Sequence, residues 1–220
     1  MALSDDMHAP VFIRNELSDA AAAIWDQLTD GNVRFASDHP ANPRRTVNDR
    51  LKWLNTQAPV AAVFSCSDSR VSAEIVFDAG IGDLFVIRNA GLVPSTEAIG
   101  SVEFAVAQLA VPLIVLMTHD GCGAVQAALA SSEAAPRSNQ SPLDRLVQGL
   151  QPAVTAARLG GTVSPDEVRA HHREGTIQTL IRRSSIIRSA VEAGALTLLG
   201  ANYSPSTGRV TADVLPRPGQ

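Results

Sequence analysis

Residues 59–70 read Pro-Val-Ala-Ala-Val-Phe-Ser-Cys-Ser-Asp-Ser-Arg, an apolar run that ends in a cluster of reactive side chains. The run over 59–65 has the length and the continuous apolar character of a strand buried on both faces. A thiol, a carboxylate and a guanidinium follow it at once, at Cys66, Asp68 and Arg70. We therefore expect a buried strand that presents reactive groups at its carboxyl end.

The same arrangement recurs along the chain and predicts the fold class. Apolar runs predict further strands, and helical spacing or capping residues predict helices between them. The expected strands cover 59–65, 83–88, 113–118, 195–203 and 209–215, and the expected helices cover 17–35, 49–55, 73–79, 96–110, 122–131, 143–158 and 165–193. The turn at 204–208 makes the last strand a hairpin partner of the one before it.

Alternating strands and helices with nearly continuous apolar strands are typical of a parallel sheet covered by helices. We therefore predict an α/β fold with a mainly parallel β-sheet: about four parallel strands plus one C-terminal antiparallel strand, flanked by helices. Residues 1–16 carry no periodic pattern and are expected to form the start of an N-terminal helical arm. We expect a single domain over 1–220, with the arm and helices in 1–56 and the α/β core in 57–220.

The composition of the chain limits which binding partners and which cellular location are expected. The 220 residues are 45% hydrophobic and 18% charged, with a net charge of −4. Such a mildly acidic chain is not expected to bind nucleic acid or an anionic membrane. The apolar stretches are too short to cross a bilayer, and the N-terminus lacks the pattern of a secretory signal. We therefore expect a cytoplasmic location. In that reducing compartment, metal binding or catalysis is a better explanation of two cysteines than a disulfide.

A second cluster of reactive residues, His119-Asp120-Gly121-Cys122, follows the apolar run over 113–118. Because ligands of parallel sheets gather at the carboxyl ends of the strands, Cys66, Arg88 and His119 are all expected at one edge. Two cysteines and one histidine form one of the ligand sets of zinc sites that keep a fourth position open. Cys66, His119 and Cys122 are therefore candidate zinc ligands.

Other interpretations of these residues remain open on spacing alone, because an H-x2-C pattern also arises by chance. Two buried free cysteines and a satisfied core histidine would give the same pattern. A phosphate-binding cysteine loop is disfavoured because Arg70 follows Cys66 by only four residues, and a dithiol redox site because the cysteines form no CxxC. The Asp68–Arg70 pair favours the metal site, since such a pair is costly to bury without a purpose.

Taken together, these motifs and others along the chain resemble those of the β-class carbonic anhydrases, and within them the bacterial branch. The matching motifs run in order along nearly the whole chain: Gly31-Asn32-Val33-Arg34-Phe35, Cys66-Ser67-Asp68-Ser69-Arg70, Arg88-Asn89-Ala90-Gly91, His119-Asp120-Gly121-Cys122-Gly123-Ala124 and Thr207-Gly208-Arg209-Val210. The resemblance implies a carbonic anhydrase that hydrates CO2 reversibly to bicarbonate and a proton, with one zinc ion per chain.

The resemblance also implies a role for each site residue. Cys66, His119 and Cys122 would bind zinc, and Asp68, held ionised by Arg70, would accept a hydrogen bond from a zinc-bound hydroxide and so orient it toward CO2. In some family members the equivalent of Asp68 leaves the arginine and takes the open zinc position. Asp68 is therefore also a candidate metal ligand, in that closed state only.

Two further residues are candidate substrate contacts by the same resemblance. Gln57 would donate a hydrogen bond to a substrate oxygen, and the backbone N–H of Gly123, at the start of a helix, would receive a bicarbonate oxygen. Sites of this family lie at a subunit interface, so a homodimer or a dimer of dimers is implied. In contrast, His171 and His172 lie in a charged helical stretch and are expected to be solvated.

The resemblance leaves other functions open. A relative with the same zinc ligands and the same Asp–Arg pair could hydrolyse carbonyl sulfide or carbon disulfide instead. A non-catalytic zinc-binding relative is the alternative from another class. The complete Asp68–Arg70 pair disfavours that alternative, because a protein without activity would be free to lose it.

Overall fold

The computed structural model describes residues 17–131, 141–161 and 163–212. The expected arm over 1–16 lies outside the described residues. None of the described helices combines the length and the apolar character needed to span a membrane.

A single mixed sheet organises the described residues, in the strand order β2-β1-β3-β4-β5. Its strands are β1 (Ala61–Cys66), β2 (Leu84–Asn89), β3 (Leu113–His119), β4 (Thr197–Ser204) and β5 (Arg209–Ala212). The first four are mutually parallel and β5 pairs antiparallel with β4. The predicted fold class is therefore confirmed, with strand ends shifted by one or two residues; residues 213–215 of the expected last strand lie outside the described part.

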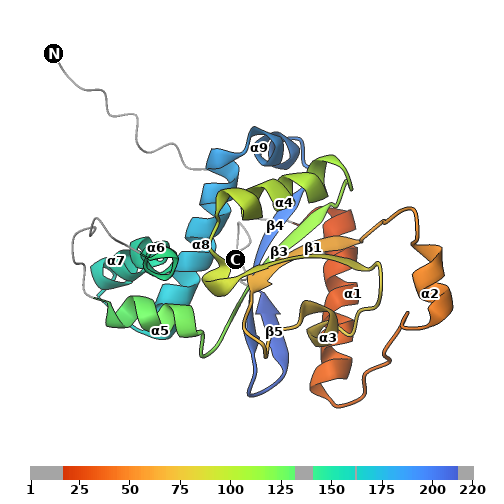
Figure 1. Ribbon diagram of the computed structural model, residues 1–220, viewed down its shortest axis with the longest axis horizontal. Helices are drawn as coiled ribbons and strands as arrows, with labels where there is room; N and C mark the ends of the chain where they lie inside the picture. Colours follow the sequence, from red (N-terminus) through yellow and green to blue (C-terminus); the bar gives the residue numbers. More distant parts are fainter. Residues whose placement is uncertain (1–16, 132–140, 162, 213–220) are drawn as a thin grey trace, which may run out of the picture.

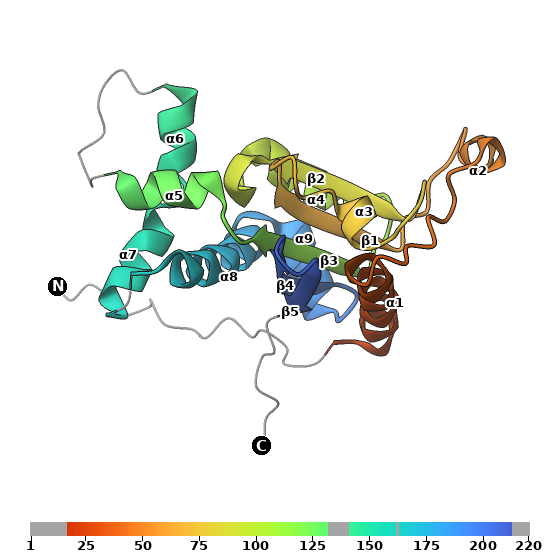
Figure 2. The ribbon, with the colours of Figure 1, turned by 90° about the horizontal axis from the view of Figure 1, so that it is seen from below.

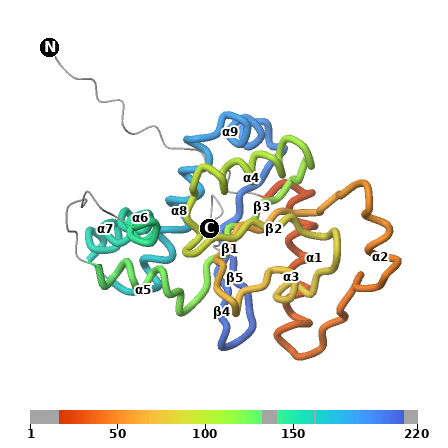
Figure 3. Tube along the Cα trace, in the orientation of Figure 1, coloured from red at the N-terminus to blue at the C-terminus, as the bar shows by residue number. Residues whose placement is uncertain are grey.

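Helices connect and cover these strands, and Figure 3 follows the chain from α1, in red, to β5, in blue. The helices are α1 (Asp19–Ala36), α2 (Val47–Lys52), α3 (Ala73–Val76), α4 (Thr96–Ala107), α5 (Gly123–Ala130), α6 (Pro142–Gln148), α7 (Gln151–Leu159), α8 (Pro165–Arg183) and α9 (Ser185–Glu192), with a 3-10 turn, η1 (Ala90–Leu92). α4, α8 and α9 pack on one face of the sheet, and α1 and α3 on the other.

Three of the helix predictions were wrong in extent. The helix expected over 143–158 is two helices, α6 and α7, that meet at Gly149 and the buried Leu150, where Pro152 in the first turn of α7 fixes a new start. The helix expected over 165–193 breaks at Ser184, whose extended backbone ends α8 and whose hydroxyl caps α9. α3 is a single turn because Asp78 adopts a left-handed conformation soon after it.

The side chains of β1 alternate between two apolar cores. Ala62 and Phe64 face the core that α4, α8 and α9 cover, whereas Ala61 and Val63 face the core beneath α1 and α3. Because successive strand residues point to opposite faces, a strand buried on both faces reads as an unbroken apolar run. This is the physical reason why residues 59–65 predict a central strand.

A third apolar cluster lies beyond the carboxyl end of the sheet. α5, α6 and α7 gather there beside α8, at the end to which the β3 arrow points in Figure 2. Cys66 and Cys122 belong to this cluster together with Leu150, Val154 and Val168. The ends of β1 and β3 are therefore enclosed rather than open to solvent.

On the other side of the sheet, α1 lies close against α3 and the β4–β5 hairpin. The buried Asn32 donates from Nδ2 to the carbonyl oxygens of Val76 (3.0 Å) and Gly208 (2.8 Å), and its Oδ1 accepts from the amide of Val210 at 2.8 Å. A Cβ atom at Gly31 would lie 1.9 Å from the backbone oxygen of Phe77. Position 31 therefore requires glycine, because the backbone at Phe77 lies too close to α1 to leave room for a side chain.

We expect Gly31→Ala to destabilise the protein by about 2 kcal/mol or more, because relieving this overlap must move backbone. The same change at Gly100, in the exposed interior of α4 where nothing lies within 4 Å, should stabilise by about 0.5–1 kcal/mol through helix propensity. Urea denaturation of both variants measures the difference. Equal stability of the two variants would contradict the close contact.

Candidate metal centre

The three candidate ligands converge at the carboxyl ends of neighbouring strands. Cys66 is the last residue of β1, His119 is the last residue of β3, and Cys122 is the N-cap residue of α5. The ligand atoms, two sulfurs and one imidazole nitrogen, all lie within 4.8 Å of one another. Parallel pairing of β1 with β3 thus brings together residues 53 and 56 positions apart in sequence.

The donor atoms fit a zinc ion. All three residues are buried, and His119 Nε2 has no hydrogen-bond partner within the described structure. The other ring nitrogen, Nδ1, lies 3.0 Å from the carbonyl oxygen of Asp120, which can only accept, so Nδ1 carries the proton and Nε2 presents a lone pair. A buried lone pair beside two thiols is costly unless a cation occupies the space between them.

The two thiols are coupled. A hydrogen bond from the Cys122 thiol lowers the pKa of Cys66, although burial opposes this shift. The same bond, together with burial, raises the pKa of Cys122. The two thiols therefore titrate as a pair and not as independent groups.

Asp68 and Arg70 form an ion pair at the mouth of the site. Arg70 Nε and one terminal nitrogen donate to the two carboxylate oxygens at 2.9 and 2.7 Å, and the same terminal nitrogen donates to the Gly121 carbonyl at 3.1 Å. These hydrogen bonds lower the pKa of Asp68, so the carboxylate stays ionised at neutral pH. Asp68 Oδ2 lies 3.9 Å from His119 Nε2. Asp68 thus faces Arg70 and borders the ligand cluster.

The expectation that this ion pair is buried was wrong for Arg70, which is exposed, and only partly correct for Asp68, which is half-buried. The Asp68 side chain is 16% exposed, whereas that of Arg70 is 55% exposed in the isolated chain. The pair lies at a boundary between the enclosed ligands and solvent, so its carboxylate can contact both.

The sequence placed Arg88 at the strand-end edge but did not predict its contacts, which are with the backbone of the loop that follows β1. Its guanidinium donates to the carbonyl oxygens of Cys66 (3.1 Å) and Asp68 (2.8 Å). Arg88 thereby fixes the backbone that carries a candidate ligand and the carboxylate. A signal was present, since Arg88 is the penultimate residue of β2, the strand paired with β1, and Ser65 is its register partner.

The expectation that His172 is solvated was wrong. His172, Arg169 and Arg173 are all buried, and α8 turns them toward the ends of the strands. Arg169 donates to Asp120 Oδ1 (2.8 Å) and Arg173 to Thr118 Oγ1 (2.7 Å), which flank His119 in sequence. The spacing offers a signal: 172 continues the four-residue series through 168, 176 and 180, whose members are buried.

The two candidate substrate contacts lie differently in the structure. Gly123 is exposed at the start of α5, immediately after Cys122, so its N–H lies at a helix N-terminus beside the ligands. Gln57 is exposed and precedes β1, whereas Cys66 ends that strand. A six-residue strand spans on the order of 17 Å. The single chain therefore does not bring Gln57 to the metal centre.

The fold and the site together define an α/β protein in which two cysteines and one histidine that could hold a metal ion converge at the strand ends. Comparison with known proteins identifies the family to which this fold and site belong. The family model described as carbonic anhydrase matches residues 61–210. A relative called carbonic anhydrase, from Mycolicibacterium smegmatis, is 40% identical over 188 residues, which cover 86% of this chain and 91% of the relative. The chain belongs to the β-class carbonic anhydrases.

Solved structures support the fold. The β-carbonic anhydrase CafA of Aspergillus fumigatus superimposes with a TM-score of 0.66 at 22% identity and covers 90% of this chain and 93% of its own. A structure from a study of two tetrameric β-carbonic anhydrases of Sordaria macrospora gives 0.62 at 24% identity and covers 87% and 96%. The parallel sheet with its helices is thus shared by proteins of low sequence identity.

Proposed function

We propose that this protein converts CO2 and water reversibly into bicarbonate and a proton, with one zinc ion per chain held by Cys66, His119 and Cys122. The observation that carries the proposal is the convergence of three buried ligand atoms within 4.8 Å, one of them an unpartnered imidazole nitrogen, beside an ionised carboxylate. Membership of the carbonic anhydrase family supports this reaction over other uses of such a site.

The chain's own residues have complementary roles in this proposal. When bound, zinc supplies the Lewis acidity that lets water ionise near neutral pH. Asp68 is ionised and can only accept a hydrogen bond, so it fixes the position of one proton of the reacting water. Arg70 keeps that carboxylate ionised and oriented through two hydrogen bonds. The N–H of Gly123 is suited to receive a substrate oxygen.

A complete site requires more than one chain in this proposal. Because Gln57 lies at the opposite end of β1 from Cys66, it can contact substrate only in a second copy of the chain. A homodimer, or a dimer of dimers like the tetrameric relatives of Sordaria macrospora, would supply it. We also propose that the chain is a single domain, that it works in the cytoplasm, and that Asp68 can move from Arg70 to the metal to close the site.

The test is stopped-flow CO2 hydration by metal-quantified protein, with carbonyl sulfide assayed in parallel. We expect about one zinc per chain and a hydration rate that rises with pH through about 7–9. Two thiolates neutralise the charge of the metal, so water should ionise at higher pH than at a site with three histidines. Asp68 does not contribute to this rise, because its lowered pKa keeps it ionised throughout.

A rate that is flat from pH 6 to 9 would contradict this explanation of the profile. Protein that contains zinc but hydrates no CO2 at pH 8.5 would overturn the proposed reaction. Turnover of carbonyl sulfide alone would then assign the site to that substrate.

A further inference from the structure

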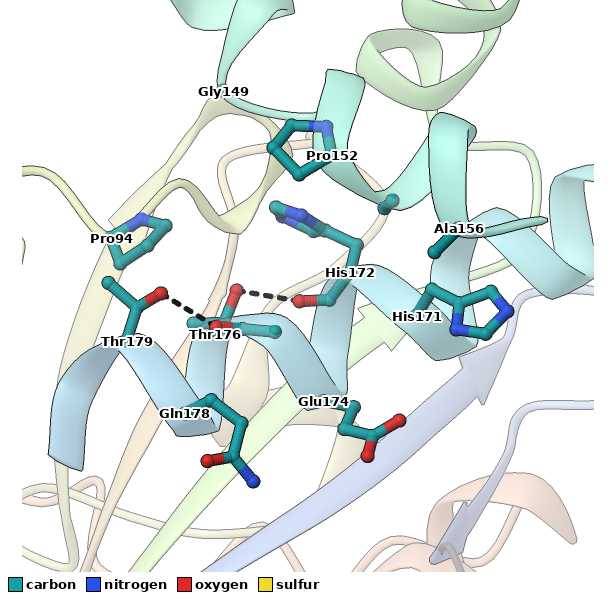
Figure 4. Close-up of a pocket in the computed structure, with 12 residues that line it drawn as sticks. Pro94, Gly149, Pro152, Ala156, His171, His172, Glu174, Thr176, Gln178 and Thr179 are labelled. Atoms are coloured by element: carbon teal, nitrogen blue, oxygen red, sulfur yellow. Dashed lines mark hydrogen bonds between the residues drawn. The ribbon is translucent and has the colours of Figure 1, made fainter. Parts of the chain in front are cut away.

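His172 lies between the candidate metal centre and a separate cavity. It borders the small pocket formed with Cys66, His119 and Cys122, and also a cavity of about 290 Å³ between α7, α8 and Pro94. Figure 4 shows that its ring projects from α8 toward Pro152, whereas the neighbouring His171 points away from it. The two adjacent histidines therefore have different surroundings, and only His172 is buried.

The hydrogen bonds of His172 define its protonation state. Its Nε2 lies 2.8 Å from the carbonyl oxygen of Gly91 and 3.1 Å from that of Leu92. Both partners can only accept, so Nε2 must carry a proton. Burial lowers the pKa of His172, which makes the neutral ring with its proton on Nε2 the form present near pH 7.

The turn that His172 holds is a conformation the chain does not adopt readily. Gly91 has φ of 74° and Leu92 has φ of 54°, and left-handed backbone is disfavoured for a leucine by about 1–2 kcal/mol. A Cβ at Gly91 would also approach Ala124 to 2.8 Å. This turn therefore requires partners outside itself, and the two carbonyls bound by His172 belong to its two left-handed residues.

The same turn directs one amide toward a metal ligand. The N–H of Gly91 donates to the sulfur of Cys66 at 3.3 Å. The Gly91 amide and the Gly91 carbonyl belong to successive planar peptide units that meet at the Gly91 Cα, so only the φ and ψ angles of Gly91 separate their directions. The hydrogen bonds from His172 to the carbonyls of Gly91 and Leu92 restrain these angles in the left-handed turn, and the same turn points the Gly91 amide at the Cys66 sulfur.

We propose that His172 is a positioning residue of the metal centre: through the carbonyls of Gly91 and Leu92 it holds the Gly91 amide against the Cys66 sulfur. The consequence for zinc rests on the function proposed above. An N–H that is held against a ligand sulfur orients the lone pairs of that sulfur before the metal binds. Mutation of groups that support metal ligands in this way typically lowers metal affinity by about 10–100-fold.

Three variants test this role. His172→Leu removes the donor at similar volume, and His172→Gln places an amide N–H where Nε2 lies. Thr176→Val is the matched control: Thr176 is buried one turn further along the same face of α8, and its hydroxyl bonds only to the carbonyl of His172 among the described contacts. Should His172→Leu fail to fold, His172→Met takes its place, since the flexible thioether adapts to irregular space.

The first measurement is hydrogen exchange of the Gly91 amide in metal-free protein, followed by NMR. We expect exchange at least about tenfold faster in His172→Leu, and close to wild type in His172→Gln and in Thr176→Val. The second is the rate of zinc loss to a chelator, which His172→Leu should raise by about 10–100-fold and His172→Gln by less than about threefold.

Unchanged Gly91 exchange in His172→Leu would overturn the proposal, as would equal effects of His172→Leu and Thr176→Val on both measurements. The exchange measurement needs no metal. A wild-type protein that binds no zinc would therefore overturn the proposed function, while the Gly91 exchange rates would still decide the role of His172.

Discussion

Replacing Cys66 with serine is expected to reduce the zinc content from about one ion per chain to below about 0.1, with complete loss of CO2 hydration. The serine hydroxyl does not ionise near neutral pH, so the change removes a thiolate and leaves only His119 and Cys122 as ligands. Sulfur and oxygen differ little in size, so the buried end of β1 should keep its structure. Metal analysis after dialysis against a chelator measures the effect.

The matched control for this change is Ser69→Ala, an exposed position in the same loop. That variant should retain zinc and activity. Circular dichroism of the Cys66→Ser protein separates loss of metal from loss of fold. Full zinc content in folded Cys66→Ser would remove Cys66 from the ligand set and with it the proposed centre.

Asp68→Asn should retain zinc and lose hydration activity by about 10²–10⁴-fold, the usual contribution of a group that positions or transfers a proton. An asparagine amide can donate as well as accept, so it no longer restricts the proton of the reacting water to one direction. It also carries no charge to pair with Arg70, which binds both oxygens of the native carboxylate. The measurement is kcat for CO2 hydration at pH 8.5, expressed per bound zinc.

Asp166→Asn serves as the control for this second change. Asp166 is also paired with an arginine, Arg169, but its side chain is 82% exposed and lies outside the ligand cluster. Its loss should leave kcat within about twofold of wild type. An active Asp68→Asn protein would show that the carboxylate beside the ligands does not orient the reaction.

Much of the fold was predictable because β1 and β3 are buried on both faces. Burial on both faces requires apolar residues without interruption, so sequence and structure carry the same signal. The convergence of two candidate ligands followed from the strand ends: once β1 and β3 are parallel neighbours, Cys66 and His119 must lie at one edge of the sheet. These inferences need no knowledge of which helix packs where.

The missed features depend on packing between distant segments. His172 has a polar sequence environment, and only the turn at Gly91 and Leu92, about 80 positions away, explains its burial. The break at Ser184 likewise involves a distant partner, since its hydroxyl donates to Glu103 at 2.6 Å. The four-residue spacing through 168, 172, 176 and 180 indicates that His172 lies on the buried face of α8, but it does not identify the distant groups that bind His172 or Ser184.

The contacts of Asn32 also have a consequence for the order in which the chain acquires its structure. Asn32 in α1 bonds to Gly208 and Val210, which are 176 and 178 positions further along the chain. The entropic cost of closing so long a loop must be met before these contacts form, and contacts between distant positions are associated with slow folding. During synthesis α1 leaves the ribosome first, yet its buried amide finds these partners only when the last hairpin emerges. The hydrogen bonds of the Asn32 amide are therefore complete only after the β4–β5 hairpin has formed.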